Sequence, residues 1–461
     1  MASDQPPRVL AATHSLCPVC LQRVPAVREQ EGEDVFLVKE CADHGRFRTV
    51  IWRGAPAFAD WQRPKKPSSP RQAATRVERG CPFDCGLCPA HGQHTCTALI
   101  EITGRCNLGC PVCFADAGGD ADQEPTLARI GFLYDRVLAA SGPCNLQLSG
   151  GEPTVREDLS AIIALARRKG FSFVQLNTNG LRLAADPDYA VQLKEAGLAS
   201  VFLQFDGLSA ASHQALRGRD LRAVKEAAIR HAAAAGLGIV LVPTLVPGVT
   251  TTEVGAIIDY AVRFAPAVRG VHFQPVSYFG RFPQAPADGD RLTLPEVIAL
   301  IAAQSGGAIR PEHFAPPACE HALCSFHGTF LIDEDGRLQP LGNRQPACCA
   351  TGPTPTALEG REKSVSRTAR QWSLPLAATD CGCTPGAGAP LDDLDRFLAR
   401  ARTHTFSISA MAFQDAWNLD LERLRGCCIH VVAPDGRLVP FCAYNLTSSE
   451  GRALYRGVTR P

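Results

Sequence analysis

The chain has 461 residues, of which 45% are hydrophobic and 20% charged, and its formal net charge is +1. This length allows two or three domains of about 150 residues each. The balanced charge argues against a nucleic-acid binder, which would need a basic face. No apolar run approaches the roughly 20 residues of a membrane span, and the N-terminus does not resemble a signal peptide. We therefore expect a cytoplasmic protein without a transmembrane segment.

Twenty cysteines are many for a chain of this size. Thiols stay reduced in the cytoplasm, so their clustering indicates metal sites rather than disulfides. The groups are Cys17, Cys20 and Cys41; Cys81, Cys85, Cys88 and Cys96; Cys106, Cys110 and Cys113; and a looser set from Cys319 to Cys442. No cysteine lies between Cys144 and Cys319, so the predicted metal sites flank a middle region without them.

Residues 1–75 predict a small metal-binding ribbon and a linker. Strand-like segments at 35–38 and 48–52 accompany two pairs of possible ligands, and a Pro- and Lys-rich stretch follows at 62–75. The candidate ligands are Cys17, Cys20, Cys41 and His44. Two such pairs can hold one tetrahedral ion, either zinc or a mononuclear, rubredoxin-like iron. Surface cysteines without a metal are the alternative.

Residues 76–96 predict a loop that wraps an auxiliary iron–sulfur cluster. Four cysteines fall within a span too crowded for a helix or a strand. They are Cys81, Cys85, Cys88 and Cys96. Four thiolates are the usual ligand set of a 4Fe–4S cluster, and zinc is the alternative.

Residues 97–290 repeat one unit six times, an apolar run followed by a turn and a helical pattern. The expected strands are 97–103, 144–149, 172–177, 199–205, 238–244 and 270–276. Strands that alternate with helices predict a parallel sheet, here an α/β fold with a partial (β/α)6 barrel. Thr154 with Glu157, and Thr250 with Glu253, have the spacing of capping boxes at helix starts.

Unusual residues follow the predicted strands. The first strand leads into a C-x3-C-x2-C loop formed by Cys106, Cys110 and Cys113, and later strands end in Ser-Gly-Gly-Glu-Pro-Thr, Asn-Thr-Asn-Gly, Gln-Phe-Asp-Gly and Pro-Thr-Leu. In an α/β barrel, ligands bind at these strand ends. Three thiolates without a fourth suggest a cubane cluster with one iron left open. A zinc knuckle or a ferredoxin-like loop is the alternative for the loop alone.

Together, these motifs resemble the radical S-adenosylmethionine (radical SAM) superfamily. The resemblance implies that a 4Fe–4S cluster on the catalytic residues Cys106, Cys110 and Cys113 chelates S-adenosylmethionine and cleaves it to a 5′-deoxyadenosyl radical. It also implies that Gly150, Gly151, Glu152 and Pro153 contact the amino end of S-adenosylmethionine. Its ribose or carboxylate would contact Asn179, Asp206 and Thr244. Val112 departs from the family pattern, which often has an aromatic residue before the third cysteine.

Residues 291–461 predict a C-terminal domain that carries auxiliary clusters. Thr293 and Glu296 mark a helix start, and Asp-Gly pairs at 335–336 and 435–436 predict two hairpins with cysteines on either side. The predicted ligands are Cys324, Cys348, Cys428 and Cys442. Ordinary buried or surface cysteines are the alternative.

The whole arrangement is similar to a narrower group, the archaeal tetraether lipid synthases, formerly described as class D radical SAM methylases acting on a pterin. This resemblance implies hydrogen abstraction from an unactivated carbon. The expected result is C–C coupling of lipid alkyl chains, with possible peripheral membrane contact. The alternative is methylation of a pterin-type small molecule with a folate-type one-carbon donor. Either enzyme would need a reductant such as flavodoxin or ferredoxin. A multi-cluster electron-transfer protein is the non-enzymatic alternative, but it has no use for the barrel.

Overall fold

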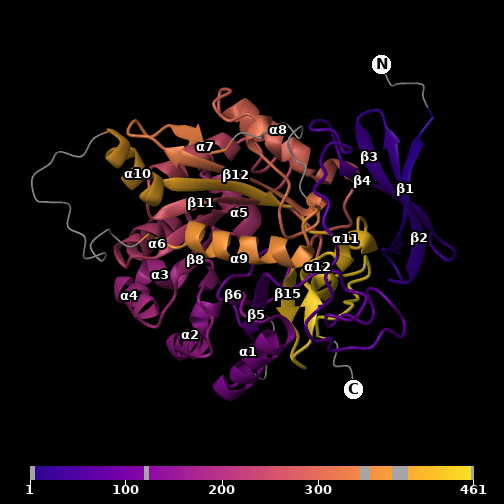
Figure 1. Cartoon of the computed structure of the whole chain (residues 1–461), viewed down its shortest axis with the longest axis horizontal. Helices are drawn as coiled ribbons and strands as arrows, with labels where there is room; N and C mark the ends of the chain where they lie inside the picture. Colours follow the sequence, from indigo (N-terminus) through magenta and orange to yellow (C-terminus); the bar gives the residue numbers. More distant parts are fainter. Residues whose placement is uncertain (1–5, 119–123, 343–352, 376–392, 458–461) are drawn as a thin grey trace, which may run out of the picture.

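The computed structural model describes residues 6–118, 124–342, 353–375 and 393–457. The N-terminal part is an antiparallel sheet of four strands, which lies at one end of the molecule (Figure 1). Its strands are β1 (Arg8–Leu16), β2 (Arg23–Glu31), β3 (Asp34–Cys41) and β4 (Gly45–Trp52). The two strand-like segments predicted at 35–38 and 48–52 lie in β3 and β4.

The second sheet contains all six strands predicted from the repeats, in parallel. They are β5 (Thr97–Thr103), β6 (Asn145–Gly150), β7 (Val174–Thr178), β8 (Ser200–Gln204), β9 (Gly238–Val242) and β11 (Val268–Pro275), with the short β10 (Thr244–Leu245) beside β11. They pair in chain order. This is the predicted partial α/β barrel.

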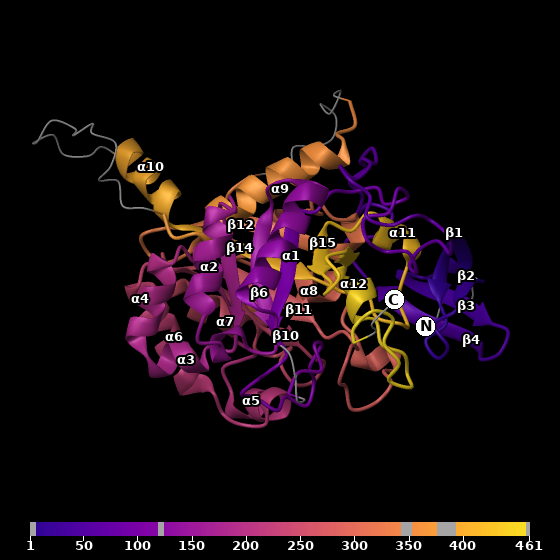
Figure 2. The same ribbon diagram turned by 90° about the horizontal axis from the view of Figure 1, so that it is seen from below.

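The helices of the repeats cover the outer face of this sheet (Figure 2). They are α1 (Leu127–Ser141), α2 (Leu159–Arg168), α3 (Leu181–Ala185), α4 (Pro187–Glu195), α5 (Ala210–Arg217), α6 (Arg222–Ala234) and α7 (Val254–Val262). Alternate strand residues such as Leu146, Leu148 and Leu176 are fully buried against them in one large hydrophobic core. The other residues of each strand face the opposite side, where the cavity described below lies.

The C-terminal third extends both edges of the barrel sheet. On one side, β14 (Thr405–Met411) pairs parallel with β11, and β12 (Ser325–Ile332) and β13 (Leu338–Pro340) follow. On the other side, β15 (Ile429–Val432) pairs parallel with β5 and antiparallel with β16 (Leu438–Pro440). Both hairpins predicted at the Asp-Gly pairs are present, as β12–β13 and β15–β16.

Helix α9 (Ala357–Trp372) lies across the inner face of the sheet, in contact with β6, β9, β11 and β14 (Figure 1). The other helices of this region are α8 (Leu294–Gln304), α10 (Asp393–Thr403), α11 (Leu421–Arg425) and α12 (Phe441–Asn445). Short 3-10 helices lie at Pro153–Val155, Asp288–Asp290, Pro311–His313 and Ala322–Cys324. In the described ranges, no helix combines the length and the apolar character that crossing a membrane requires.

The N-terminal sheet is fastened to the C-terminal segment. Arg28 on β2 forms a buried ion pair with Asp420, at 2.7 Å, and Lys39 on β3 donates a hydrogen bond to the carbonyl of Ala416, at 2.8 Å. The two ends of the chain are therefore joined by buried polar contacts.

Candidate active site and metal centres

A cavity of about 530 Å³ lies between the inner face of the barrel sheet, α9 and the cysteine loop. This volume is within the usual range of small-molecule sites, about 300–1,000 Å³. The cavity is lined at the carboxyl ends of the strands by Cys106, Cys110, Cys113, Gly150, Gly151, Glu152, Asn179 and Thr244. The structure thus gathers eight of the predicted cofactor residues around one space.

The cysteine loop fits an iron–sulfur cluster by its donors and their spacing. Cys110 is buried, Cys106 and Cys113 are half-buried, and burial raises the pKa of the Cys106 thiol. In the described part of the chain, the loop thiols are not among the groups whose ligand atoms all lie within 4.8 Å of one another. A wider spacing suits a cluster of several irons better than one ion. Val112 and Phe114, on either side of Cys113, both line the cavity.

Gly150 and Gly151 lie where the chain leaves β6, pressed against the loop that follows β5. A Cβ on Gly150 would lie 2.2 Å from the carbonyl oxygen of Thr103, and one on Gly151 would lie 2.1 Å from that of Arg105. Any side chain here would push the cysteine loop away from the cavity. The two glycines therefore fix the distance between this strand end and the cluster loop.

The carboxylate of Glu152 turns toward the protein. It accepts hydrogen bonds from the hydroxyls of Thr154 and Thr178, at 2.6 and 2.7 Å, and from the backbone N–H of Asn179, at 2.7 Å. The side chain is buried and ties the end of β6 to the end of β7. Contact with an ammonium group, expected from the sequence, stays a prediction, and the neighbouring Pro153 is not among the cavity-lining residues.

Asp206 does not line the cavity, which differs from the expectation. Its carboxylate is fully buried and forms a two-point ion pair with Arg217 of α5, at 2.6 and 2.5 Å. Burial raises the pKa of Asp206, but the Arg217 charge and its hydrogen bonds outweigh this effect and hold that pKa below its usual range. Arg217 itself does line the cavity, and its guanidinium is 3.3 Å from the hydroxyl of Thr244.

Arg217 is a functional candidate that the sequence reasoning missed. It stands 11 residues after Asp206, at the end of a helix, where nothing in the sequence distinguishes it from a surface arginine. The buried side chain also interacts with Cys110. A guanidinium at this point suits the carboxylate of a ligand held beside the cysteine loop.

Lys225 of α6 stabilises the turn that follows β7. Its buried ammonium donates a hydrogen bond to the carbonyl of Asn179, at 2.7 Å. Burial lowers the pKa of Lys225 from 10.5 to about 8, against the opposing effect of Asp206. Since the unfolded chain binds this proton more tightly, folding stability should rise with pH between about 8 and 10.5.

We expect the wild-type free energy of unfolding to rise by about 2 kcal/mol between about pH 7.5 and 9.5 relative to Lys225→Met. Urea unfolding at both pH values measures this difference. Lys169→Met removes a partly exposed lysine that pairs with Asp135 and should follow the wild-type pH dependence. If wild type and Lys225→Met showed the same pH dependence of unfolding, the assignment of this dependence to Lys225 would be wrong.

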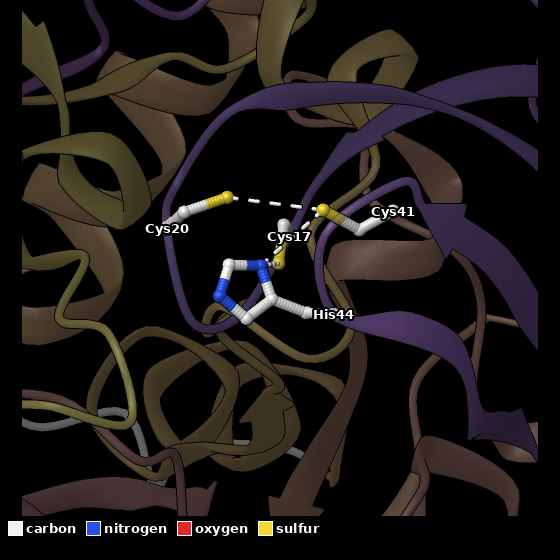
Figure 3. Close-up of side chains that lie close together, drawn as sticks. All are labelled: Cys17, Cys20, Cys41 and His44. Carbon is white, nitrogen blue, oxygen red and sulfur yellow. Dashed lines mark hydrogen bonds between the residues drawn. The ribbon is translucent and has the colours of Figure 1, made fainter.

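The predicted ribbon ligands Cys17, Cys20, Cys41 and His44 converge at the end of the N-terminal sheet (Figure 3). Nδ1 of His44 lies 3.7 Å from Sγ of Cys17 and 3.4 Å from that of Cys41, and the thiols of Cys20 and Cys41 are 3.9 Å apart. Thiolates about 2.3 Å from a tetrahedral ion are about 3.8 Å apart. The residues therefore fit a single ion, and hydrogen bonding to His44 lowers the pKa of Cys41 to about 7, toward the thiolate form.

Cys96 belongs to a different group from the one predicted. Its Sγ lies 2.9 Å from that of Cys428, and Cys319 completes a trio of buried thiols whose sulfur atoms all lie within 4.8 Å of one another. A carboxylate oxygen of Glu320 is 4.0 Å from the Cys428 sulfur, and Cys96 and Glu320 line the cavity. The donors fit a metal centre in the wall of the cavity.

The loop of Cys81, Cys85 and Cys88 surrounds a separate small hollow, which His91 also lines. Asp84 shapes this loop, because its carboxylate accepts the backbone N–H groups of residues 78–80 at 2.7 to 2.8 Å. Hydrogen bonding from Cys85 lowers the pKa of Cys81. The thiols of Cys81, Cys85 and Cys88 line this hollow together, but the predicted fourth ligand, Cys96, lies with Cys319 and Cys428.

The predicted C-terminal ligand set is also divided. Cys428 joins Cys96. Burial raises the pKa of Cys427, and the charges of Cys442 and Cys324 raise it further, so these two thiols lie near Cys427. Cys348 lies outside the described residues. The four were predicted as one set, and the described three are distributed over two places.

We expect Cys319→Ser to remove the metal of one centre and leave the others filled. Serine keeps the size of the side chain but is a poor ligand for soft metals. Measurement of the iron, zinc and sulfide content per chain should show one metal centre fewer than in the wild type. Cys144→Ser alters another buried thiol, which belongs to neither group of close ligand atoms in the described chain, and should leave metal content unchanged.

The strands give the cavity a row of polar side chains, although most of its lining surface is apolar. Its strand residues are mostly amides, hydroxyls and imidazoles: Asn145, Gln147, Ser149, Asn177, Gln204, His272, Gln274, Ser325, His327, Thr329, Ser407 and Ser409. The side-chain oxygens of Asn145 and Asn177 are buried and accept no hydrogen bond from the protein. A ligand with hydrogen-bonding groups suits the amides, hydroxyls and imidazoles of this wall.

Two family models match the chain: the HMPTM N-terminal zinc ribbon domain over residues 9–53, and the radical SAM superfamily over residues 100–261. The 7,8-dihydro-6-hydroxymethylpterin dimethyltransferase of Methanocaldococcus jannaschii is 36% identical over 94% of this chain and 93% of its own length. A probable GTP 3′,8-cyclase of Methanothermobacter thermautotrophicus is 34% identical over 28% of this chain and 41% of its own length. Among solved structures, Streptococcus suis SuiB bound to S-adenosylmethionine matches with a TM-score of 0.35 and 12% identity, over 42% of this chain and 44% of SuiB.

Proposed function

Because the chain belongs to the radical SAM family of the M. jannaschii dimethyltransferase, we propose that it methylates a pterin-type small molecule. The sequence had favoured the coupling of lipid alkyl chains, with pterin methylation as the alternative. The full-length relative acts on a pterin by its name, and it favours that alternative.

The observation that carries the proposal is the row of polar side chains along the strands of the cavity, whose lining is otherwise largely apolar. An alkyl chain has no hydrogen-bonding group, so it would leave these side chains without a polar partner. A pterin ring has an amino group, ring N–H groups and ring acceptors that can pair with amides, hydroxyls and imidazoles. Its flat surface also suits the aromatic group of Phe202, His272 and Trp372, whose ring centroids lie 5.4 to 6.1 Å apart at one part of the wall.

The cofactor site has the residues that radical SAM chemistry requires. Cys106, Cys110 and Cys113 would hold the 4Fe–4S cluster, and Arg217 would bind the carboxylate of S-adenosylmethionine. Together, cluster and S-adenosylmethionine supply a radical that can remove hydrogen from an unactivated carbon. The protein positions the ligands, through the Glu152 network, and excludes water from the cavity. A folate-type molecule as one-carbon donor, and a flavodoxin or ferredoxin as reductant, are the partners that we propose.

The proposal is tested under anaerobic conditions with iron- and sulfide-reconstituted protein, dithionite, S-adenosylmethionine and a tetrahydrofolate that carries a one-carbon unit. We expect 7,8-dihydro-6-hydroxymethylpterin to gain methyl groups by mass spectrometry, and deuterium from a labelled pterin to appear in 5′-deoxyadenosine. A diether lipid should remain unchanged in a parallel reaction. Coupled lipid tails, together with an unmodified pterin, would overturn the proposal.

A further inference from the structure

We propose that the end of the cavity remote from the cysteine loop binds an oxyanion of the ligand, through Arg63, His327 and Arg367. This inference rests on the proposed function and narrows its ligand. The molecule in the cavity would carry a phosphate ester or carboxylates. The oxyanion would come either from an ester of the pterin or from the tail of the folate-type donor.

The three side chains come from separate elements and meet at the cavity wall. Nη1 of Arg367, on α9, lies 2.8 Å from Nε2 of His327 on β12, and its Nη2 donates a hydrogen bond to the hydroxyl of Thr329, at 2.6 Å. Arg63 approaches from the segment between the two sheets and donates to the carbonyl of Pro316, at 2.8 Å. All of these side chains except Pro316 line the cavity, as does Lys363, one turn before Arg367 on α9.

The strand register places this group opposite the cysteine loop. Thr329 pairs with Ser407, and Ser407 pairs with Gly270, near the start of β11. The cysteine loop follows β5 at the carboxyl ends of the parallel strands. A ligand that spans the cavity would therefore have its anionic group at one end and its reacting carbon at the other.

The charges of this group are not balanced by acids. In the described part of the chain, no ion pair includes Arg63, Lys363 or Arg367. Burial first, and then the Arg63 charge, lowers the pKa of Arg367. Burial lowers the pKa of His327, and the charges of Arg367 and Arg63 lower it further, to about 3, so its ring is neutral. Glu320 is the acid whose charge acts on Arg63.

Two buried arginines outside this group have acidic partners. Arg28 and Arg291 each pair with a buried aspartate, at 2.7 and 2.8 Å. Arg63 and Arg367 are instead exposed side chains at the cavity wall, and the hydrogen bonds that they donate go to neutral partners. Guanidinium groups match phosphate and carboxylate in geometry and charge, so an oxyanion is the ligand that this end of the cavity can stabilise.

Inorganic pyrophosphate tests the site without a pterin. Isothermal titration calorimetry on the anaerobic, reconstituted full chain should show binding to the wild type. We expect about tenfold weaker binding, or more, in Arg367→Gln and in Arg63→Gln. Arg370→Gln is the matched control, because Arg370 is an arginine of the same helix that is exposed, as Arg367 is, but does not line the cavity. Equal binding to wild type and both test variants would overturn the inference.

A second experiment identifies the source of the oxyanion. The affinities of 7,8-dihydro-6-hydroxymethylpterin, its phosphate ester and tetrahydrofolate are compared in wild type and Arg367→Gln. If Arg367→Gln weakens only the binding of the ester, by about tenfold or more, the site binds the phosphate of the pterin. If it weakens only the binding of tetrahydrofolate, the site binds the tail of the one-carbon donor. If all three ligands bind both proteins equally, the inference fails even where the pterin is methylated. Arginine-dependent pyrophosphate binding without any methylation would reject the proposed function and retain the oxyanion site.

Discussion

Cys110→Ala should abolish the formation of 5′-deoxyadenosine. Cys110 is the buried member of the cysteine loop and packs with Leu108 and Leu221, so its thiolate has the most restricted position of the three. Two remaining thiolates cannot hold a cubane in the orientation that a reaction beside Arg217 requires. Mass spectrometry of the product after reduction and addition of S-adenosylmethionine measures the loss.

The remaining metal sites separate loss of the cluster from loss of the fold. In Cys110→Ala, the ribbon metal and the centre at Cys96, Cys319 and Cys428 should stay filled, since neither uses this thiol. Cys144→Ala removes a buried thiol outside those groups and should form 5′-deoxyadenosine at the wild-type rate. Undiminished product in Cys110→Ala would refute the assignment of the radical cluster to this loop.

Asp206→Asn should lower the free energy of unfolding by about 3 to 5 kcal/mol, because it leaves the buried guanidinium of Arg217 without a counter-charge. Asparagine keeps the shape of the side chain and tolerates the positive φ of 58° at this position. Urea unfolding of the metal-loaded protein measures the change. Asp220→Asn breaks an exposed ion pair with Arg222 and should lower the free energy of unfolding far less.

A double variant separates stability from cofactor binding. Asp206→Asn with Arg217→Met removes both charges and should recover most of the lost stability. It should still bind S-adenosylmethionine about tenfold or more weakly, because the proposed carboxylate partner is gone. Wild-type affinity in this double variant would show that Arg217 has only a structural role.

The sequence predicted local features well where one segment decides them. The strand near residue 174 was predicted at 172–177 and is found at Val174–Thr178, because an apolar run between turn residues suffices to define it. The capping box of Thr293 and Glu296 is present. The boxes predicted at Thr154 and Thr250 are wrong: the hydroxyl of Thr154 donates to Glu152, and that of Thr250 to the carbonyl of Thr244.

The grouping of the cysteines could not be predicted, because it depends on pairing between distant strands. Ile429 of β15 pairs with Thr97 of β5, and this register brings the preceding residues, Cys428 and Cys96, together. Nothing near Cys96 in the sequence indicates that partner. Arg217 was missed for a similar reason, since only the fold turns the end of α5 toward the cavity.

The two flanks of the barrel sheet also set the order in which the protein can mature. Strand β15 completes the edge beside β5, and the thiols of Cys96 and Cys428 are separated by 332 residues in the chain. Contacts over such separations form late, after most of the loop entropy has been lost. The wall of the cavity, and the metal centre in it, therefore cannot form on the ribosome before the C-terminal segment emerges. Insertion of that metal is consequently a post-translational event, whereas the ribbon at Cys17 and His44 can be loaded as soon as the first sheet is made.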